Sequence, residues 1–379
     1  MRVLVVNAGS SSLKVDLVAG GVRQHSYDGL PTRPPAVDAV GHRIVHGGRD
    51  LVEPVLIDED VEQRLRDLVD LAPLHQPKSL DGLAAARRLL PKVPHVACFD
   101  TAFHATLPPA AYTYALPLAW RERWGVRRYG FHGLSHQWAS RRAYEIVPSA
   151  RRVITCHLGA GASLAAVLDG RSVDTTMGFT PLDGLVMATR SGAIDPGLIT
   201  WLQEHENLDP QQVAHALEYD SGLFGLAGTA DMRELLARQD DQAQLALAVY
   251  LHRLITSIGA MTASLGGLDV LVFTGGVGEG AAEVRRRCAI GLDYLGVRVS
   301  DHLNQTVHPD ADISLDHSPV KTLVVQSRED LQVARDVGEL LALPTAIGQT
   351  PVSMAWAHNE VATGLPLDPC HPMRHTRHV

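Results

Sequence analysis

Apolar residues in this chain fall into short runs that stop at turns of small residues. The first run ends at Asn7-Ala8-Gly9-Ser10-Ser11-Ser12, after which come Lys14 and an alternating segment from Val15 to Val18. This pattern predicts a β-hairpin whose turn leaves backbone N–H groups and hydroxyls free to face an anion. It is not the Walker loop, because no Gly-Lys-Ser/Thr follows and the next element is a strand. We interpret it as a phosphate-handling hairpin, with an ordinary solvated turn as the alternative.

The same pattern recurs in the second half of the chain. An apolar run from Val153 to Cys156 breaks at His157-Leu158-Gly159-Ala160-Gly161-Ala162-Ser163 and resumes from Leu164 to Val167. A third run, at 270–273, enters Thr274-Gly275-Gly276-Val277-Gly278-Glu279-Gly280 and then a helical pattern. Two related halves facing one cleft, each with a turn near a polyphosphate, explain this repetition. Chance recurrence of turns in a chain with 33 glycines is the competing explanation, and the pattern favours duplication.

Helical periodicity and further strands fill the rest of the chain. The pattern predicts helices at 61–71, 80–90, 135–146, 245–265 and about 330–343, and strands at 93–99 and 320–325. Strands that alternate with helices indicate an α/β protein. A domain boundary is expected near Pro148, because a new strand begins at Val153. From Thr345 the periodicity ends in Pro, Gly and His residues, which predicts a disordered tail whose histidines are not expected to bind a metal.

Composition narrows the class of protein. A length of 379 residues with 45% hydrophobic residues predicts about two domains with substantial cores. A net charge of -8 without a basic stripe argues against nucleic acid as the main partner. We expect no signal peptide, and the apolar stretch at 245–265 contains His252 and Arg253, which favours a buried helix over a membrane span. The four cysteines are scattered, as in a reduced cytoplasmic protein.

Several polar segments carry more charge and histidine than a core tolerates. Arg43 lies between histidines and glycines at 41–48, and His75 lies at a helix end, in the loop at 73–77. Asp100 ends a strand, His132 follows Gly130 and Phe131, and Arg190 lies in a Gly/Pro-containing loop. Taken singly, such residues are usually solvated, salt-bridged or capping groups. Together with three phosphate-type turns they indicate phosphoryl transfer, which needs arginines, a histidine donor and a divalent cation held by oxygen ligands.

Six colinear motifs then identify a family. They are Asn7-Ala-Gly-Ser-Ser-Ser-Leu-Lys14, Gly41-His-Arg-Ile-Val-His-Gly-Gly48, Phe99-Asp-Thr-Ala-Phe-His104, Arg128-Tyr-Gly-Phe-His-Gly133, Thr180-Pro-Leu-Asp-Gly184 and Ser327-Arg328-Glu329-Asp330-Leu331. With Arg190 they resemble the acetate kinase family over most of the chain up to about residue 344. Neighbouring propionate and butyrate kinases share much of this pattern.

The resemblance implies the fold of the acetate and sugar kinase, Hsp70 and actin superfamily. This is a duplicated, actin-like (RNase H-like) α/β kinase fold of two domains with the nucleotide in the cleft between them. We expect an N-terminal domain at 1–148 on the carboxylate side and a C-terminal domain at 149–330 on the nucleotide side. A terminal helix at 331–344 is expected to pack back on the first domain, and 345–379 to form the tail.

The resemblance also implies roles for individual residues. Asp100 would be the catalytic acid/base or would position the carboxylate. Arg43 and Arg190 would clamp the acetate carboxylate and the transferring phosphoryl group, and His132 would stabilise the transition state with help from His75. The apolar pocket for the acetate methyl would be formed by Val45, Leu74, Phe131 and Pro181.

The resemblance also implies residues that bind the nucleotide and its cation. The resemblance places Asn7 and Glu329 near Mg²⁺, for which Mn²⁺ could substitute, and Lys14 near the phosphates of ATP. The remaining nucleotide contacts would come from His157, Leu158, Gly159, Ala160, Gly161, Asp231, Met232, Arg233, Gly276, Val277, Gly278, Glu279 and Gly280. The expected reaction is direct in-line attack of acetate on the γ-phosphorus, which gives acetyl phosphate and ADP reversibly.

Three positions depart from the family pattern. Ala160 stands where asparagine is usual, Ala193 replaces an aspartate and Gly280 replaces an asparagine. The stretch between the first hairpin and Gly41 is also shorter than usual. These changes put turnover and nucleotide preference in question while leaving the proposed catalytic groups in place.

Two alternatives to an acetate kinase stay open. One is a kinase for a longer carboxylate such as propionate or butyrate, because a methyl-sized pocket discriminates by only about 1–3 kcal/mol per methylene. The other is a nucleotide-binding regulator with weakened catalysis, which Ala160 suggests. The resemblance further implies a homodimer, whereas the cysteines, the net charge and the hydropathy predict a cytoplasmic protein with neither a nucleic-acid nor a membrane partner.

Overall fold

The computed structural model describes residues 1–8, 13–73 and 76–342, so that Leu74, His75 and the turn at 9–12 lie outside the described residues, as does the expected tail. The first sheet has six strands in the order β3-β2-β1-β4-β6-β5. The strands are β1 (Arg2–Ala8), β2 (Leu13–Ala19), β3 (Val22–Asp28), β4 (Ala39–Ile44), β5 (Val55–Leu56) and β6 (His95–Phe99). Strands β1, β4 and β6 run parallel, whereas β2, β3 and β5 pair antiparallel with their neighbours.

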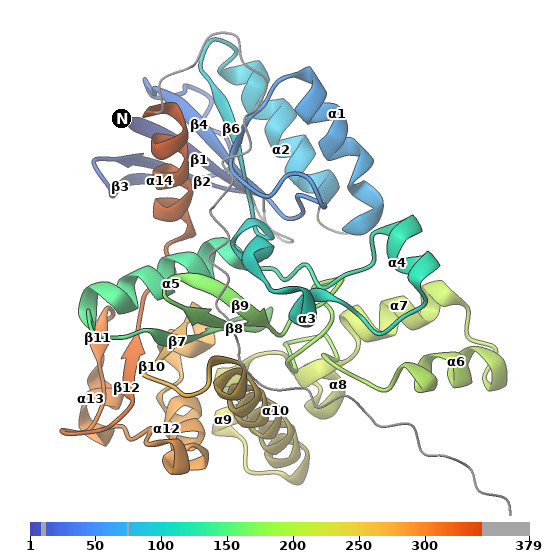
Figure 1. The fold of residues 1–379 in the computed structure, drawn as a ribbon, viewed down its shortest axis with the longest axis vertical. Coiled ribbons are helices and arrows are strands. Elements are labelled where there is room, and N and C mark those ends of the chain that lie inside the picture. The colour runs from blue at the N-terminus through green and yellow to red at the C-terminus, as the bar shows by residue number, and fades with distance from the viewer. Residues whose placement is uncertain (9–12, 74–75, 343–379) are drawn as a thin grey trace, which may run out of the picture. The chain divides into compact units, whose positions relative to one another are not determined.

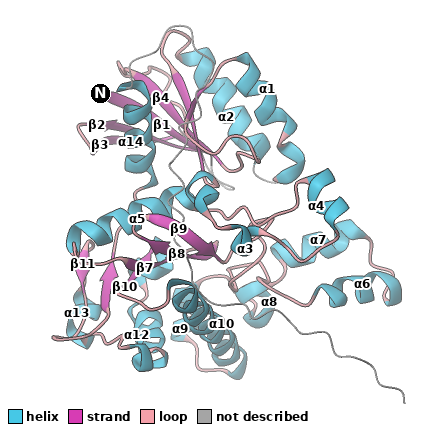
Figure 2. Ribbon diagram, in the orientation of Figure 1, coloured by secondary structure: helices cyan, strands magenta, loops and turns pink. Residues whose placement is uncertain are grey.

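The second sheet repeats the first. Its order, read from the equivalent edge, is β9-β8-β7-β10-β12-β11, with β7, β10 and β12 parallel and the others antiparallel to their neighbours. The strands are β7 (Arg152–Leu158), β8 (Ala162–Leu168), β9 (Arg171–Thr175), β10 (Val270–Thr274), β11 (Ala311–Asp312) and β12 (Lys321–Val324). Both sheets are visible as separate magenta layers in Figure 2. The same order, direction and chain sequence of six strands confirms the predicted duplication.

Helices cover the first sheet from both the beginning and the end of the chain. On one face lie α1 (Glu59–Asp67) and α2 (Gln76–Leu89), and on the other lies α14 (Glu329–Ala342), as Figure 1 shows. Helix α14 packs through Val333 and Val337 on Val3 and Val5 of β1. A Cβ atom at Gly41 of β4 would lie 2.5 Å from Val333 Cγ1, so that glycine permits the close approach of α14.

The second sheet lies between α5 (Gly133–Ile146) and α10 (Asp241–Leu265). Ala139 and Ala143 of α5 pack with Val153 and Val270, so a helix that precedes residue 148 covers the second sheet. Residues 1–342 form one compact unit, and the division at residue 148 stays a prediction. The other helices are α3 (Pro109–Tyr112), α4 (Leu118–Trp124), α6 (Pro196–His205), α7 (Pro210–Tyr219), α8 (Gly222–Ala227), α9 (Met232–Ala237), α11 (Gly275–Gly280), α12 (Ala282–Gly291) and α13 (Asp301–Thr306).

The long helix α10 is fixed by its ends and its apolar face. The Asp240 side chain accepts a hydrogen bond from the Ala243 N–H at the N-cap, and Gly266 ends the helix in the left-handed conformation at φ 66°. Within the described ranges, α10 is the one helix long and apolar enough to cross a membrane by length and composition alone. Core helices pass the same test, and Leu247, Leu254 and Ile258 are buried in the main hydrophobic cluster.

Element boundaries differ from the sequence predictions in instructive ways. The helix predicted at 61–71 ends at Asp67 and continues as a 3-10 turn at Val69–Leu71, and the glycine-rich segment after β10 forms the short helix α11 rather than a turn. Strand β4 was missed because His42 and Arg43 interrupt its apolar pattern, although five of its six residues are buried. Strand β3 was missed because its side chains are almost all exposed.

Candidate active site

Parallel strands deliver three of the predicted residues to one edge of the first sheet. Asn7 near the end of β1 is the direct register partner of Arg43 near the end of β4. Asp100 follows β6, and its N–H donates to the Ile44 carbonyl at 3.0 Å. The carboxyl ends of parallel strands are where ligand-binding groups gather in α/β folds. The topology therefore brings an amide, a guanidinium and a carboxylate together.

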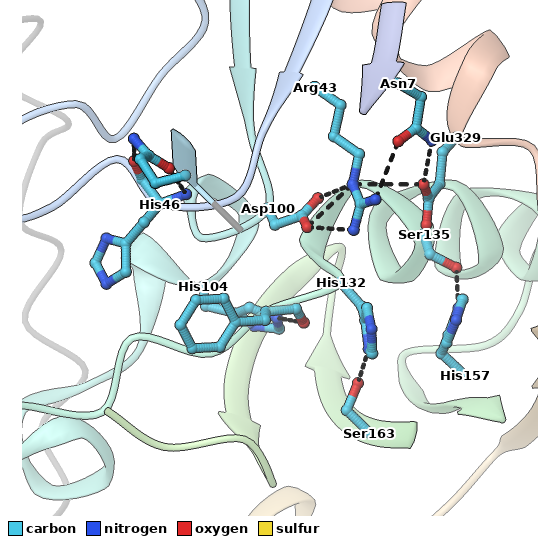
Figure 3. A network of polar contacts seen from close by, with 12 residues as sticks. Asn7, Arg43, His46, Asp100, His104, His132, Ser135, His157, Ser163 and Glu329 are labelled. Carbon is cyan, nitrogen blue, oxygen red and sulfur yellow. Dashed lines mark hydrogen bonds and ion pairs between the residues drawn. The ribbon is translucent and has the colours of Figure 1, made fainter. Parts of the chain in front are cut away.

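Arg43 and Asp100 form the central ion pair of this group (Figure 3). Arg43 Nη2 donates to Asp100 Oδ2 at 2.6 Å, and Arg43 Nε lies 3.0 Å from Oδ1. Asp100 is 1% exposed, and burial raises the pKa of its carboxyl while Arg43 opposes that shift. Burial alone would lower the pKa of Arg43, but Asp100 and Glu329 outweigh it and raise that pKa. The guanidinium consequently stays charged and held in one orientation.

Glu329 joins this pair from the start of α14. Its Oε2 atom lies 3.6 Å from Arg43 Nε and accepts a hydrogen bond from Asn7 Nδ2 at 3.2 Å. Asn7 Oδ1 accepts in turn from Arg43 Nη1 at 3.1 Å. Asn7 and Glu329, which are 322 positions apart in the chain, thus meet at one point.

His132 approaches from the loop that leads into α5. It adopts a left-handed conformation at φ 57°, and the N–H of the next residue, Gly133, donates to the Asp100 carbonyl at 2.8 Å. Its ring stacks on that of His157 with centroids 4.4 Å apart. Burial, reinforced by the neighbouring histidines and arginines, holds the pKa of His132 well below 6.5. The imidazole is therefore neutral at physiological pH.

Arg190 lies beside His132 at Gly161. A Cβ atom at Gly161 would lie 3.2 Å from His132 Nε2 and 3.4 Å from Arg190 Nη1, so this glycine marks the space shared by the two side chains. Arg190 Nε donates to Glu218 Oε1 at 2.6 Å, and Nη1 donates to the Pro181 carbonyl at 3.4 Å. The structure thus brings Arg190, His132 and the turn after β7 together.

The glycine-rich segments of the second half meet at the ends of their strands. Thr274 of β10 is the register partner of His157 of β7, and a Cβ atom at Gly275 would lie 2.8 Å from the Leu158 carbonyl. Glu279 Oε1 accepts from the Gly275 N–H at 3.0 Å and from the Ser327 N–H at 2.8 Å. Glu279 therefore ties α11 to the segment that carries Glu329, and its carboxylate has a structural role.

The other predicted nucleotide residues make no side-chain hydrogen bond or ion pair with this group within the described residues. Lys14 is exposed on β2, opposite Asn7 in the strand register. Asp231 caps α9 and pairs with Arg233 at 2.7 Å, and Met232 is 5% exposed. Ala160 is exposed, and its carbonyl accepts from the Ala188 N–H at 3.1 Å.

The predicted methyl pocket is only partly described, because Leu74 and His75 lie outside the described residues. Val45 and Phe131 are 7% and 1% exposed and belong to one hydrophobic cluster. Pro181 is half-buried and contacts Arg190 through its carbonyl. Pro181 therefore lies beside the Arg190 guanidinium.

A cavity of about 500 Å³ lies at the other end of β7 and does not involve these groups. It is lined by Arg151, Arg152 and Asp269, among others. Both arginines are paired, Arg151 with Asp169 and Arg152 with Asp269. Because these charges are already neutralised, the cavity offers no free cation to an anionic substrate.

Several site residues escaped sequence reasoning. Glu218 pairs with Arg190, Ser135 contacts His157, and Ser163 contacts both His132 and His136. One of these contacts had a signal in the sequence. His136 lies four residues after the predicted His132, a spacing that puts two residues on one side of a helix and could have added His136 to the site. The serines and Glu218 carry no such signal, since only the fold brings them to the site.

The duplicated sheets and the charged strand ends define a member of the acetate and sugar kinase, Hsp70 and actin superfamily. The acetokinase family model matches residues 29–335, and the chain belongs to that family. An acetate kinase from Protochlamydia amoebophila is 46% identical over 308 residues, which cover 80% of this chain and 78% of that protein.

Solved structures of related kinases are similar to this chain in fold as well as in sequence. A propionate kinase from Francisella tularensis has a TM-score of 0.82 and 33% identity, and covers 89% of this chain and 98% of its own. An acetate kinase from Porphyromonas gingivalis has a TM-score of 0.81 and 35% identity, and covers 90% of this chain and 99% of its own. These matches extend the family likeness to the tertiary fold.

Proposed function

We propose that this protein is an acetate kinase that transfers the γ-phosphoryl group of ATP reversibly to acetate. A carboxylate oxygen of acetate forms a bond to the γ-phosphorus while the bond from that phosphorus to the bridging oxygen breaks, which yields acetyl phosphate and ADP. The observation that supports this best is the meeting of the Arg43–Asp100 pair with Asn7 and Glu329, next to His132. Family membership and the similarity to acetate kinases support the choice of acceptor.

In this proposal the two arginines divide the charge of the reacting groups. Arg43 is fixed by Asp100, and Arg190 is fixed through its Nε by Glu218, so each has its remaining N–H groups prearranged. Preformed donors of this kind stabilise the charge that develops on a transferring phosphoryl group. His132 contributes a neutral donor, and the apolar side chains of Val45 and Phe131 form one wall for the methyl group of acetate.

Asn7 and Glu329 fit a divalent cation. Their side chains meet through Asn7 Nδ2 and Glu329 Oε2, and each carries a hard oxygen donor, with Asn7 Oδ1 accepting from Arg43 Nη1. No cluster of three or more His, Cys, Asp or Glu side chains able to hold a metal occurs within the described ranges. Mg²⁺ suits such a sparse set, because it keeps several water and phosphate ligands of its own. The cation would neutralise charge on the ATP phosphates.

The test is formation of acetyl phosphate by the purified chain with MgATP and acetate. We expect a metal-dependent activity that EDTA abolishes and Mg²⁺ or Mn²⁺ restores, and that Glu329→Gln weakens mainly by raising the metal concentration required. Propionate and butyrate are compared in the same assay. A tenfold higher kcat/KM for a longer acid, about 1.4 kcal/mol, would replace acetate as the substrate. ATP binding without any product would instead favour the regulator.

A further inference from the structure

A chain of three hydrogen bonds runs from the interior of the second sheet to His132 (Figure 3 shows its last link). Thr155 Oγ1 on β7 lies 2.7 Å from His136 Nδ1, and His136 Nε2 lies 2.7 Å from Ser163 Oγ on β8. Ser163 Oγ lies 2.9 Å from His132 Nδ1. Thr155, Ser163 and His136 are each 0% exposed, so bulk solvent does not reach these bonds.

The protons in this chain are not independent. Burial keeps the pKa of both His132 and His136 well below 6.5, so each imidazole is neutral and carries one N–H. The Ser163 hydroxyl has one proton and can donate to only one of the two rings. If it donates to His132, then His136 must donate through Nε2 and accept from Thr155 through Nδ1. If it donates to His136, every bond in the chain reverses.

The two arrangements give His132 Nε2 opposite hydrogen-bonding roles, as a donor in one and an acceptor in the other. When Ser163 donates to His132 Nδ1, the proton of His132 lies on Nε2, the atom that faces the space at Gly161 beside Arg190. In the reversed arrangement Nε2 carries a bare lone pair. Among the described residues Nε2 has no hydrogen-bond partner, so it is available to a ligand. Only the first arrangement lets His132 donate to a phosphoryl oxygen.

We propose that Thr155 and Ser163, acting through His136, are positioning residues that hold the proton of His132 on Nε2, where it donates to the transferring phosphoryl group. This inference rests on the proposed function, because the phosphoryl oxygen is what Nε2 would bind. No net proton enters or leaves the chain.

His104 provides an internal control of matched chemistry. Its Nδ1 lies 2.8 Å from Ser172 Oγ, and its Nε2 lies 3.1 Å from the Phe131 carbonyl. Ser172 is as buried as Ser163 and also contacts a buried histidine. It is not hydrogen-bonded to the Thr155–His136–Ser163 chain. Ser172→Ala therefore removes an equivalent buried hydroxyl without touching the proposed proton arrangement.

The experiment compares Thr155→Val, which keeps the side-chain volume, and Ser163→Ala with Ser172→Ala, and tests rescue by Thr155→Ser. We expect kcat to fall by about tenfold or more in the first two variants, as for other groups that orient a functional histidine. The KM values for ATP and acetate should stay within about twofold, and Ser172→Ala and Thr155→Ser should retain wild-type kcat. Equal losses in Ser172→Ala would overturn the proposal in favour of a purely structural role.

Imidazole ¹⁵N NMR gives a readout that does not depend on activity. With His132 assigned by its loss in His132→Asn, the wild type should show the proton on Nε2. Ser163→Ala removes the donor to His132 Nδ1, and Thr155→Val removes the donor to His136 Nδ1, so the ¹⁵N resonance of each of these nitrogens should move toward that of an unbonded ring nitrogen. A wild-type proton on Nδ1 of His132, or unchanged Nδ1 resonances of both histidines in the two variants, overturns the proposal. An inactive wild type with the expected tautomers would refute the proposed function but leave the positioning chain intact. If Ser163→Ala does not fold, Thr155→Val decides.

Discussion

At the level of single residues, Arg190 is held in place by two contacts within the protein. Glu218 holds its Nε, and Pro181 holds Nη1, so the fork is aimed before substrate arrives. We expect Arg190→Ala to lower kcat by about 10²–10³-fold, as removal of a preorganised donor does, with ATP affinity nearly unchanged. Steady-state kinetics with acetate and a direct ATP-binding measurement test this. Arg190→Lys is the comparison variant that keeps the positive charge but not the planar guanidinium. Near-normal turnover in Arg190→Ala would show that Arg190 does not contact the phosphoryl group.

Ala160 allows a gain-of-function test. Its side chain is exposed in the turn between β7 and β8, so a larger residue has room there. Restoring the family's usual asparagine adds an amide to the turn that we propose contacts the phosphates, where a hydrogen bond to an ion is worth about 1.5–3 kcal/mol. We expect Ala160→Asn to raise kcat/KM by about 10- to 150-fold if the bond forms fully in the transition state. Ala160→Leu is the volume control, and equal rates in both variants would contradict the prediction.

His42 links a buried imidazole to stability. It is 1% exposed, its Nε2 contacts His95 Nδ1 at 2.9 Å, and burial lowers its pKa to about 3. Below about pH 6.5 the His42 imidazole is protonated in the unfolded chain but stays neutral in the folded chain. The free energy of unfolding therefore falls as the pH falls toward 3. The loss is about 1.4 kcal/mol per pH unit for this group. Urea unfolding at several pH values between 7 and 4.5 gives the free energy of unfolding as a function of pH. This free energy should fall less steeply with falling pH for His42→Gln than for the wild type, and equal pH dependences would contradict the prediction.

At the level of elements, the contact between β4 and α14 packs the last described helix on the first sheet. A Cβ atom at Gly41 would lie 2.5 Å from Val333 Cγ1 and 2.9 Å from Val337 Cγ2. We expect Gly41→Ala to lower the free energy of unfolding by about 1–3 kcal/mol through overpacking. Val333→Ala should relieve part of this loss, so that the double variant is more stable than the sum of the single effects predicts. Additive effects in denaturant unfolding would contradict the direct contact.

This contact also affects the site, because α14 begins at Glu329. A displaced α14 would move the Glu329 carboxylate relative to Asn7 and Arg43. The metal requirement of Gly41→Ala is therefore a second measurement of the same coupling. We expect Gly41→Ala to need more Mg²⁺ for half-maximal activity than the wild type does.

At the level of the whole molecule, exposed aromatic residues support a homodimer. Trp120 and Trp124 of α4 are 49% and 52% exposed, and Trp201 of α6 is 46% exposed. Contiguous exposed apolar side chains mark interaction surfaces, and the rings of Trp120 and Trp124 lie next to each other with centroids 5.7 Å apart. We propose that these helices contribute to self-association. Light scattering should show a dimer for the wild type and a monomer for Trp124→Glu, whereas Tyr294→Glu, a change at an exposed residue outside α4 and α6, should stay dimeric. A monomeric wild type would contradict the proposal.

The sequence alone identified the duplication, the strand ends and the principal charged residues. Apolar runs reveal buried strands whatever their neighbours are, and small-residue turns at their ends reveal where ligands can approach. Asn7, Arg43, Asp100 and Glu329 were singled out in this way or by the family motifs, and the structure places them in one network. Their individual roles stay predictions, as do those of Leu74 and His75.

Only the tertiary structure determined which side chains meet. Strand β4 escaped because functional polar residues interrupt its pattern, and Ser163, His136 and Glu218 escaped because an isolated serine, histidine or glutamate looks like any other. Periodicity records which face of an element is buried, which is a local property. Hydrogen bonds such as that between Asn7 and Glu329 join residues 322 positions apart, and they exist only once the sheets and helices have packed.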